Sequence, residues 1–241
     1  MRETLILLPG WGLDGALLQP LAEALQPDLD VLVPVLPRLS STATADWLDE
    51  LDTRLPQNCW LAGWSLGGML ASTLAARRGK RCRGLISLAS NARFVASDAW
   101  PQAMPADTYA TFHEGCSHNA GATLKRFAML CAQGSGNARG LARLLQANVL
   151  ACEPSLMAGL QVLAMLDNRH ALAAFTGPQL HLLAESDALV PAAVADELLA
   201  LLPAGEVDVL DECGHAFVIE QAGTVATLML DFIHEASDGQ S

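Results

Sequence analysis

The chain has 241 residues, 51% of them hydrophobic, and a formal net charge of −12 at pH 7. This length allows one α/β domain with an inserted subdomain, and the negative charge together with the lack of a binding motif argues against nucleic acid as a partner. No apolar run reaches the length of a membrane span, so we expect a cytoplasmic protein that does not bind membranes.

In chain order, short aliphatic runs and helical periodicities alternate on either side of a long middle segment. The runs are typical of parallel strands that are buried on both faces, and we predict strands at 4–8, 31–35, 59–63, 84–89, 179–184 and 206–210. We predict helices at 15–25, 45–54, 66–78, 192–202 and 223–234. This alternation indicates a mostly parallel sheet of about six strands, flanked by helices.

The middle segment, residues 94–177, contains no convincing strand. Apolar residues recur there with helical spacing at 107–114, 122–132, 138–151 and 155–166. We interpret this segment as an all-helical cap, inserted between two parts of one α/β core, residues 1–93 and 178–241. The six cysteines form no Cys-x-x-Cys pair, which is typical of reduced, buried thiols.

The stretch Gly63-Trp64-Ser65-Leu66-Gly67 is a Gly-x-Ser-x-Gly pentapeptide between a predicted strand and a predicted helix. A serine on such a sharp turn has a strained backbone and an exposed hydroxyl group. Glycines flank it because side chains there would collide with neighbouring backbone. The alternative is a tight turn with an exposed serine, so the nucleophile hypothesis requires an acid and a base elsewhere in the chain.

Asp187 and His215 follow Ser65 in the order that this motif requires. Asp187 comes just after the predicted strand 179–184, and loops at the carboxyl ends of parallel strands are where α/β folds build their sites. Glu185 is the rival carboxylate, but it lies closer to the strand end. The alternatives are a helix-capping aspartate and a lone polar loop histidine. We predict that Ser65, Asp187 and His215 form a catalytic triad.

A second oxyanion donor is expected from the loop after the first strand, which contains Gly10-Trp11-Gly12. We assign the backbone N–H groups of Trp11 and Leu66 to the oxyanion hole, and the Trp11 ring to an apolar wall. Plain packing of Trp11 is the alternative. His113, Cys116 and His118 are clustered but lack a fourth metal ligand, so we predict no metal and no other cofactor.

Charge is distributed unevenly along the chain. Between residues 77 and 143 there are ten basic and three acidic residues. This region includes Lys125, Arg126, Arg139 and Arg143, and the last two are spaced i and i+4 on one helix face. Such a basic stripe could steer an acidic partner or be an ordinary solvated face, and charge alone leaves both interpretations open.

With these groups in view, the chain resembles the α/β-hydrolases, and more narrowly the pimeloyl-acyl-carrier-protein methyl ester carboxylesterases of biotin synthesis. The resemblance covers nearly the full length. It rests on Gly10-Trp11-Gly12-Leu13, Gly63-Trp64-Ser65-Leu66-Gly67-Gly68, Ala89-Ser90-Asn91, Trp100-Pro101, Arg126-Phe127, Ala138-Arg139, Ala142-Arg143, Asp187 and Gly214-His215.

The resemblance implies an α/β-hydrolase fold, in which Arg126, Arg139 and Arg143 hold the acidic carrier protein. It also implies a substrate channel lined by Trp11, Leu66, Phe127, Ala128, Met129, Leu130, Cys131 and His215. Two departures stand out. Pro9 replaces the histidine that is common before Gly-Trp-Gly, and Ala122 stands where a further arginine is expected, a loss for which Lys125 compensates.

We therefore predict a monomeric serine carboxylesterase that hydrolyses the methyl ester of pimeloyl-acyl-carrier protein and releases methanol. Three alternatives remain open at this point. They are a broad carboxylesterase for short-chain esters, a non-catalytic binding module on the same fold, and a C–C hydrolase or lyase that uses the same triad.

Overall fold

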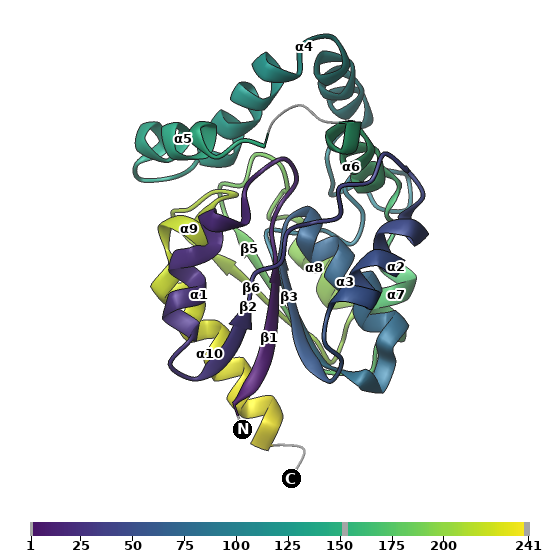
Figure 1. The fold of residues 1–241 in the computed structure, drawn as a ribbon, viewed down its shortest axis with the longest axis vertical. Coiled ribbons are helices and arrows are strands. Elements are labelled where there is room, and N and C mark those ends of the chain that lie inside the picture. The colour runs from purple at the N-terminus through teal and green to yellow at the C-terminus, as the bar shows by residue number, and fades with distance from the viewer. Residues whose placement is uncertain (1, 151–153, 239–241) are drawn as a thin grey trace.

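The computed structural model describes residues 2–150 and 154–238, and it contains one six-stranded sheet (Figure 1). The strand order is β2-β1-β3-β4-β5-β6, and every neighbouring pair is parallel. The strands are β1 (Glu3–Leu8), β2 (Leu29–Leu32), β3 (Cys59–Trp64), β4 (Cys82–Leu88), β5 (Gln179–Ala184) and β6 (Glu206–Leu210). The predicted fold class is confirmed.

The second strand differs from its predicted position at 31–35. It pairs with β1 from Leu29 to Leu32 and then stops. Pro34 and Pro37 follow directly, and proline has no N–H group to donate to a neighbouring strand. The apolar run therefore continues past the residues that can pair, and the strand is shorter and earlier than its hydrophobicity suggests.

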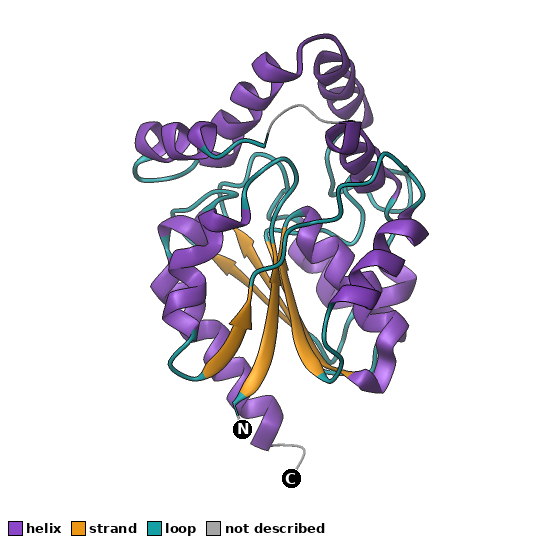
Figure 2. Ribbon diagram, in the orientation of Figure 1, coloured by secondary structure: helices purple, strands orange, loops and turns teal. Residues whose placement is uncertain are grey.

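Helices cover both faces of the sheet, with α1 and α10 on one face and α2, α3 and α7 on the other (Figures 1 and 2). The core helices are α1 (Gln19–Leu25), α2 (Thr44–Arg54), α3 (Leu66–Arg78), α8 (Val194–Leu201), α9 (Phe217–Glu220) and α10 (Ala222–Asp238). Short 3-10 helices occupy Gly15–Leu18 and Gly79–Arg81. The helix predicted at 15–25 is split, because Pro20 starts α1 within its first turn.

The segment between β4 and β5 contributes α4 (Ala106–Ala132), α5 (Ala138–Ala147), α6 (Pro154–Met165) and α7 (Arg169–Ala174). The first three lie over the carboxyl ends of the strands (Figure 1). Two predicted helices are joined in α4, which bends at Asn119, where the side chain accepts a hydrogen bond from the Ala122 N–H. The helix predicted at 138–151 ends earlier, at Ala147, and residue 151 lies outside the described residues.

The unpredicted helix α7 packs on the core helix α3. Asn168, just before it, accepts a hydrogen bond from Thr73 and donates one to the Met69 carbonyl oxygen. The end of the inserted segment is thus tied to the core, while α4, α5 and α6 cover the strand ends. The domain bounds 94–177 stay a prediction.

Two compositional expectations can be compared with the structure. Cys59, Cys82, Cys131 and Cys213 are buried and form no disulfide, and Cys152 lies outside the described residues. Within residues 2–150 and 154–238, no helix is both long enough and apolar enough to cross a bilayer.

Candidate active site

Ser65 lies on the turn between β3 and α3 with φ 56° and ψ −120°. A non-glycine residue adopts this conformation only when its surroundings enforce it. A Cβ atom at Gly63 would lie 2.3 Å from the Gly67 carbonyl group, and one at Gly67 would lie 2.4 Å from the Leu8 carbonyl oxygen. The Ser90 hydroxyl donates to the Ser65 carbonyl oxygen at 2.9 Å. The pentapeptide thus forms the strained strand-to-helix turn that its sequence predicts.

Asp187 and His215 are joined by a hydrogen bond of 2.7 Å between Oδ2 and Nδ1, and both side chains are fully buried. The other carboxylate oxygen, Oδ1, accepts the backbone N–H groups of Leu189 and Val190 at 2.7 and 3.0 Å. These two amides fix the carboxylate, so that Oδ2 holds the imidazole ring in one orientation.

The remaining imidazole nitrogen, Nε2 of His215, is buried and has no hydrogen-bond partner among the described residues. Trp64 connects this histidine to the nucleophile turn, because it directly precedes Ser65 and its indole Nε1 donates to the His215 carbonyl oxygen at 2.9 Å. The Trp64 ring also lies 5.7 Å from the imidazole ring, centroid to centroid. His215 Nε2 is therefore available to accept a proton, and the hydrogen bond from Trp64 holds the His215 backbone near the Ser65 turn.

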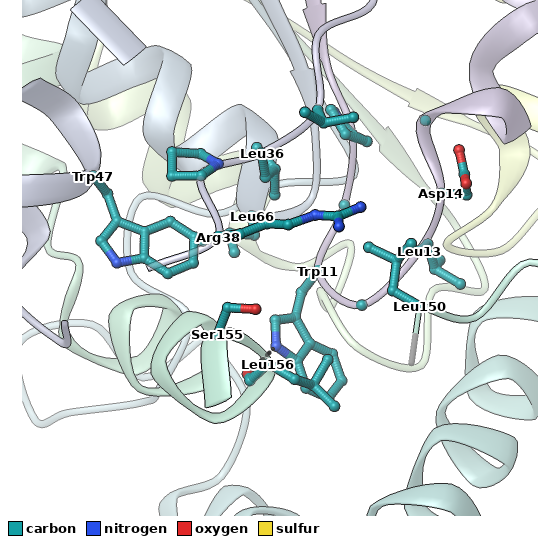
Figure 3. A pocket seen from close by; sticks show the side chains of 16 residues that line it. Trp11, Leu13, Asp14, Leu36, Arg38, Trp47, Leu66, Leu150, Ser155 and Leu156 are labelled. Atoms are coloured by element: carbon teal, nitrogen blue, oxygen red, sulfur yellow. Dashed lines mark hydrogen bonds between the residues drawn. The ribbon is translucent and has the colours of Figure 1, made fainter. Parts of the chain in front are cut away.

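The proposed oxyanion residues, Trp11 and Leu66, line one cavity of about 220 Å³ (Figure 3). A Cβ atom at Gly10 would lie 3.6 Å from the Ser65 Cβ, so the loop that carries Trp11 passes directly beside the serine. Leu66 begins α3, and the amide groups of a first helical turn have no acceptor within the helix. Both backbone segments therefore lie directly next to Ser65.

The Trp11 ring is fixed by the helices above the strand ends. Its Nε1 donates to the Leu156 carbonyl oxygen of α6 at 2.7 Å. Phe112 and Phe127 of α4 meet the ring edge to face, at centroid distances of 5.7 and 5.1 Å. Because an indole held on three sides cannot rotate freely, the backbone of Trp11 is held in place as well.

A second cavity, of about 200 Å³, lies on another side of Trp11, and we call it the apolar cavity. It is lined by Trp11, Phe94, Met104, Thr108, Tyr109, Thr111, Phe112, Arg126, Phe127, Leu130, Leu160, Leu163 and Leu189. Arg126 is its one charged lining residue among the described residues. Leu189 links this cavity to Asp187, because it lines the cavity and its backbone N–H group donates a hydrogen bond to the Asp187 carboxylate.

Of residues 127–131, which we expect to line an acyl channel, only some line the apolar cavity. Phe127 and Leu130 line the apolar cavity. Ala128 and Cys131 are buried but contribute to neither cavity, and the Met129 side chain is 54% exposed. Only one side of a helix can line a cavity, which explains the division.

Sequence reasoning missed the other cap residues of the apolar cavity, among them Tyr109, Phe112, Leu160 and Leu163. The signal was present, because these residues are three apart in two predicted helices, a spacing that puts them on one helix face. The sequence does not show which face of each helix looks toward the serine.

The carboxyl-terminal end of α4 packs on the loops that carry Asp187 and His215. The Cys131 carbonyl oxygen accepts the Ala216 N–H at 3.1 Å. A Cβ atom at Gly214 would lie 1.8 Å from the Gln133 carbonyl oxygen, and one at Gly134, where φ is 84°, would lie 2.5 Å from the Ser186 Cβ. Burial, with a smaller contribution from Asp187, raises the pKa of the Cys131 thiol, so this cysteine stays protonated.

Four cations form an exposed group on α4 and α5, and we call it the docking face: Lys125, Arg126, Arg139 and Arg143. None of them has an ion-pair partner among the described residues. The buried residues of α5 are Leu141, two positions from both arginines, and Leu145, two positions after Arg143, so they lie on the opposite side of the helix. The arginines thus contribute charge to the surface without contributing to the packing of α5.

The cluster of His113, Cys116 and His118 does not form a ligand set. No group of three His, Cys, Asp or Glu residues is arranged to hold a metal ion in the part of the chain that the structure describes. The Nδ1 atom of His118 instead lies 2.9 Å from the Glu114 carbonyl oxygen, within its own helix.

Two relatives are similar over nearly the whole chain. The chain is 40% identical over 238 residues to the biotin biosynthesis bifunctional protein BioHC of Cellvibrio japonicus, covering 96% of this chain and 47% of that protein. It is 33% identical over 246 residues to the pimeloyl-[acyl-carrier protein] methyl ester esterase of Aromatoleum aromaticum, covering 96% and 98%. The chain thus spans about half the length of the bifunctional relatives and nearly all of the esterase.

Among solved structures, an esterase from Exiguobacterium antarcticum superposes with a TM-score of 0.83 at 15% identity, covering 96% of this chain and 92% of that one. That likeness supports the fold. The alpha/beta hydrolase family model matches residues 5–228. A match over this much of the sequence, on a parallel sheet of six strands with Ser65 at the turn after β3, shows that the chain belongs to the alpha/beta hydrolase family.

Proposed function

We propose that this chain is a serine carboxylesterase that hydrolyses the methyl ester of a pimeloyl group attached to an acyl-carrier protein. The observation that carries the proposal is the buried Asp187–His215 pair beside the strained turn of Ser65. The substrate rests on two further features, the apolar cavity next to this pair and the docking face above it. The names of the relatives support the same substrate.

In the first half of the reaction, His215 Nε2 takes the proton of Ser65 while the serine Oγ attacks the ester carbonyl carbon. Asp187 keeps the imidazole in the correct tautomer and stabilises the imidazolium that forms. The N–H groups of Trp11 and Leu66 bind the oxyanion, and each such donor contributes roughly 10²–10³ in rate. His215 then protonates the leaving oxygen, and methanol departs.

In the second half, His215 activates a water molecule that attacks the acyl-enzyme. The carbon–oxygen bond to Ser65 breaks, the serine recovers its proton, and the free carboxylic acid remains on the carrier. Every proton moves through His215 Nε2, which is the nitrogen without a partner among the described residues.

The acyl chain and the carrier lie on the same side of Trp11 in this proposal. The methylene chain occupies the apolar cavity, where burial of each CH₂ group contributes about 0.8 kcal/mol. Arg126 belongs both to this cavity and to the docking face. A carrier protein with an acidic surface can therefore bind the cations while its attached chain enters beside Arg126.

Charge reversal on α5 tests the carrier. Arg139→Glu with Arg143→Glu should lower kcat/KM for the carrier-bound ester on the order of tenfold to a hundredfold, because like charges then face an acidic partner. Activity on a short aryl ester should stay within about twofold, since both arginines are exposed and do not pack. The measurement is steady-state kinetics on both esters.

The matched control is Lys80→Glu with Arg81→Glu, which reverses two exposed charges outside the cap. It should leave both activities within about twofold. Equal losses on both substrates in the α5 variant would contradict carrier docking and favour a broad carboxylesterase. We also propose that the enzyme acts as a monomer in the cytoplasm, where thiols such as those of Cys59, Cys82, Cys131 and Cys213 stay reduced.

A further inference from the structure

Two cavities meet at Trp11, and they differ in chemistry. The apolar cavity lies on the side of α4 and has one charged lining residue among those described. The cavity of Figure 3, which we call the polar cavity, lies on the side of Leu66 and the loop after β2. An ester has two arms, acyl and alkoxy, that extend from the reacting carbon. If the acyl arm occupies the apolar cavity, as the proposed function requires, the polar cavity faces the alkoxy arm.

The polar cavity is much larger than a methoxy group requires. Its volume is about 220 Å³, whereas a site for one water molecule needs only about 10–15 Å³. The residues that line it are Pro9, Gly10, Trp11, Gly12, Leu13, Asp14, Gly15, Val35, Leu36, Pro37, Arg38, Trp47, Leu66, Leu150, Ser155 and Leu156. A methyl ester leaves most of this space to solvent, so the cavity can hold a longer alkoxy arm.

Arg38 is the cation of this cavity. Its side chain points toward the loop that carries Leu13 and Asp14 (Figure 3). It forms no ion pair and no side-chain hydrogen bond with any residue that the structure describes. The planar guanidinium group presents paired N–H donors that match a carboxylate, and the Ser155 hydroxyl adds another possible donor in the same cavity.

The other charged group of the described lining is Asp14. One oxygen of this carboxylate, Oδ1, accepts the Ala16 N–H at 2.9 Å and caps the 3-10 helix that follows. Asp14 thus already has a structural role, whereas the donors of Arg38 have no partner among the described residues. Asp14 stays negatively charged, so the N–H groups of Arg38 are the cationic donors that the polar cavity offers to an anion.

We propose that the polar cavity is a binding site for the alkoxy arm, and that Arg38 selects arms that carry a carboxylate. The substrates are esters of hydroxy acids, such as glycolate esters. Hydrolysis follows the same balanced steps as for a methyl ester. The acyl carbon–oxygen bond breaks as Ser65 is acylated, the leaving alkoxide receives its proton from His215, and water then releases the acid.

The test compares two esters that share one acyl group, hexanoyl glycolate and hexanoyl glycolamide. Their alkoxy arms have similar size but differ in charge. The ratio of their kcat/KM values should favour glycolate roughly three- to fivefold in the natural protein, as expected of a partly exposed ion pair. Arg38→Gln should bring the ratio to one or below, and Arg38→Glu should lower it further. Added salt should reduce the ratio in the natural protein.

Each variant's ratio cancels any loss that both esters share, including a loss from partial misfolding. The matched control is Arg81→Gln, an exposed arginine outside both cavities, which should keep the natural ratio. An unchanged ratio in Arg38→Gln would overturn the inference. Turnover of the carrier-bound methyl ester is measured alongside, because its absence would refute the proposed function while the ratio on free esters still tests Arg38.

Discussion

At the scale of single residues, two buried histidines have contrasting surroundings. His215 is hydrogen-bonded to Asp187 at 2.7 Å. His181 lies within β5, and its Nε2 atom has no hydrogen-bond partner among the described residues. Burial lowers the pKa of His181 from 6.5 to about 4, because the charged imidazolium loses its hydration there.

This shift predicts a dependence of stability on pH. The unfolded chain binds a proton at His181 near pH 6.5, while the folded chain resists it until about pH 4, so the free energy of unfolding should fall as pH drops between these values. The contribution is about 2–3 kcal/mol at pH 4.5. His181→Leu should remove that part of the decrease, as measured by urea unfolding at pH 7 and pH 4.5.

The same substitution at the exposed His234 is the control, and it should leave the difference between the two pH values as in the natural protein. If His181→Leu and the natural protein lost equal stability on acidification, His181 would not be the group responsible.

Individual site residues differ in how far the sequence could predict them. Ser65 was predictable because the glycines at 63 and 67 leave only a tight turn there. Asp187 and His215 were predictable because each comes after a predicted strand, and because both follow Ser65 in the order that the motif requires. The two amides that bind Asp187 depend on the geometry of one loop. The hydrogen bond from Trp64 to His215 joins residues distant in sequence. No local sequence pattern predicts either feature.

At the scale of elements, α4 joins the exposed cations Lys125 and Arg126 to the loop that carries His215. Its carboxyl-terminal end is hydrogen-bonded to the loop of His215 through Cys131 and Ala216. Glu220, at the end of α9, accepts a hydrogen bond from the Ser135 hydroxyl at 2.6 Å. The carboxyl-terminal end of α4 and the residues just after it are therefore held against the loop that carries His215 and against α9.

Gly214 is the closest point of this contact, so Gly214→Ala should separate α4 from the loop. The added Cβ would lie 1.8 Å from the Gln133 carbonyl oxygen. We expect esterase activity to fall roughly tenfold or more, because small displacements of catalytic groups are costly, and Tm to fall by roughly 5 °C. Kinetics and thermal unfolding measure the two effects.

Gly223→Ala is the matched control. A Cβ atom there would meet no atom within 4 Å, and alanine is favoured over glycine in a helix. This variant should keep full activity and an equal or higher Tm. Full activity in Gly214→Ala would show that the contact of α4 with the histidine loop is not needed to place the base.

Elements were predictable where periodicity is strong and local. The ends of β5 and β6 match their predicted ranges, since their apolar runs are bounded by polar or turn residues. The bend at Asn119 depends on a hydrogen bond from the Ala122 N–H to the Asn119 side chain, and the helix α7 depends on packing against α3. The early end of β2 follows from prolines that have no N–H group to donate. Hydrophobic periodicity contains none of these causes.

At the scale of the whole molecule, positive charge is concentrated in the middle of a chain that is negatively charged overall. The chain carries −12 overall, yet residues 115–150 contain four basic residues and no carboxylate. Under the proposed function, an acidic carrier is attracted to this region, which favours approach from the side of α4 and α5. In that orientation the attached chain would enter the apolar cavity beside Arg126, which lines it.

The proposed role of Ser65 is tested most directly by hydrolysis of carrier-bound methyl pimeloate by the natural protein and by Ser65→Ala, followed by mass spectrometry of the intact carrier. We predict loss of the methyl group and release of methanol with the natural protein. Turnover by the variant should be lower on the order of 10⁵–10⁶, with carrier binding retained. Undiminished hydrolysis by Ser65→Ala would show that Ser65 is not the nucleophile.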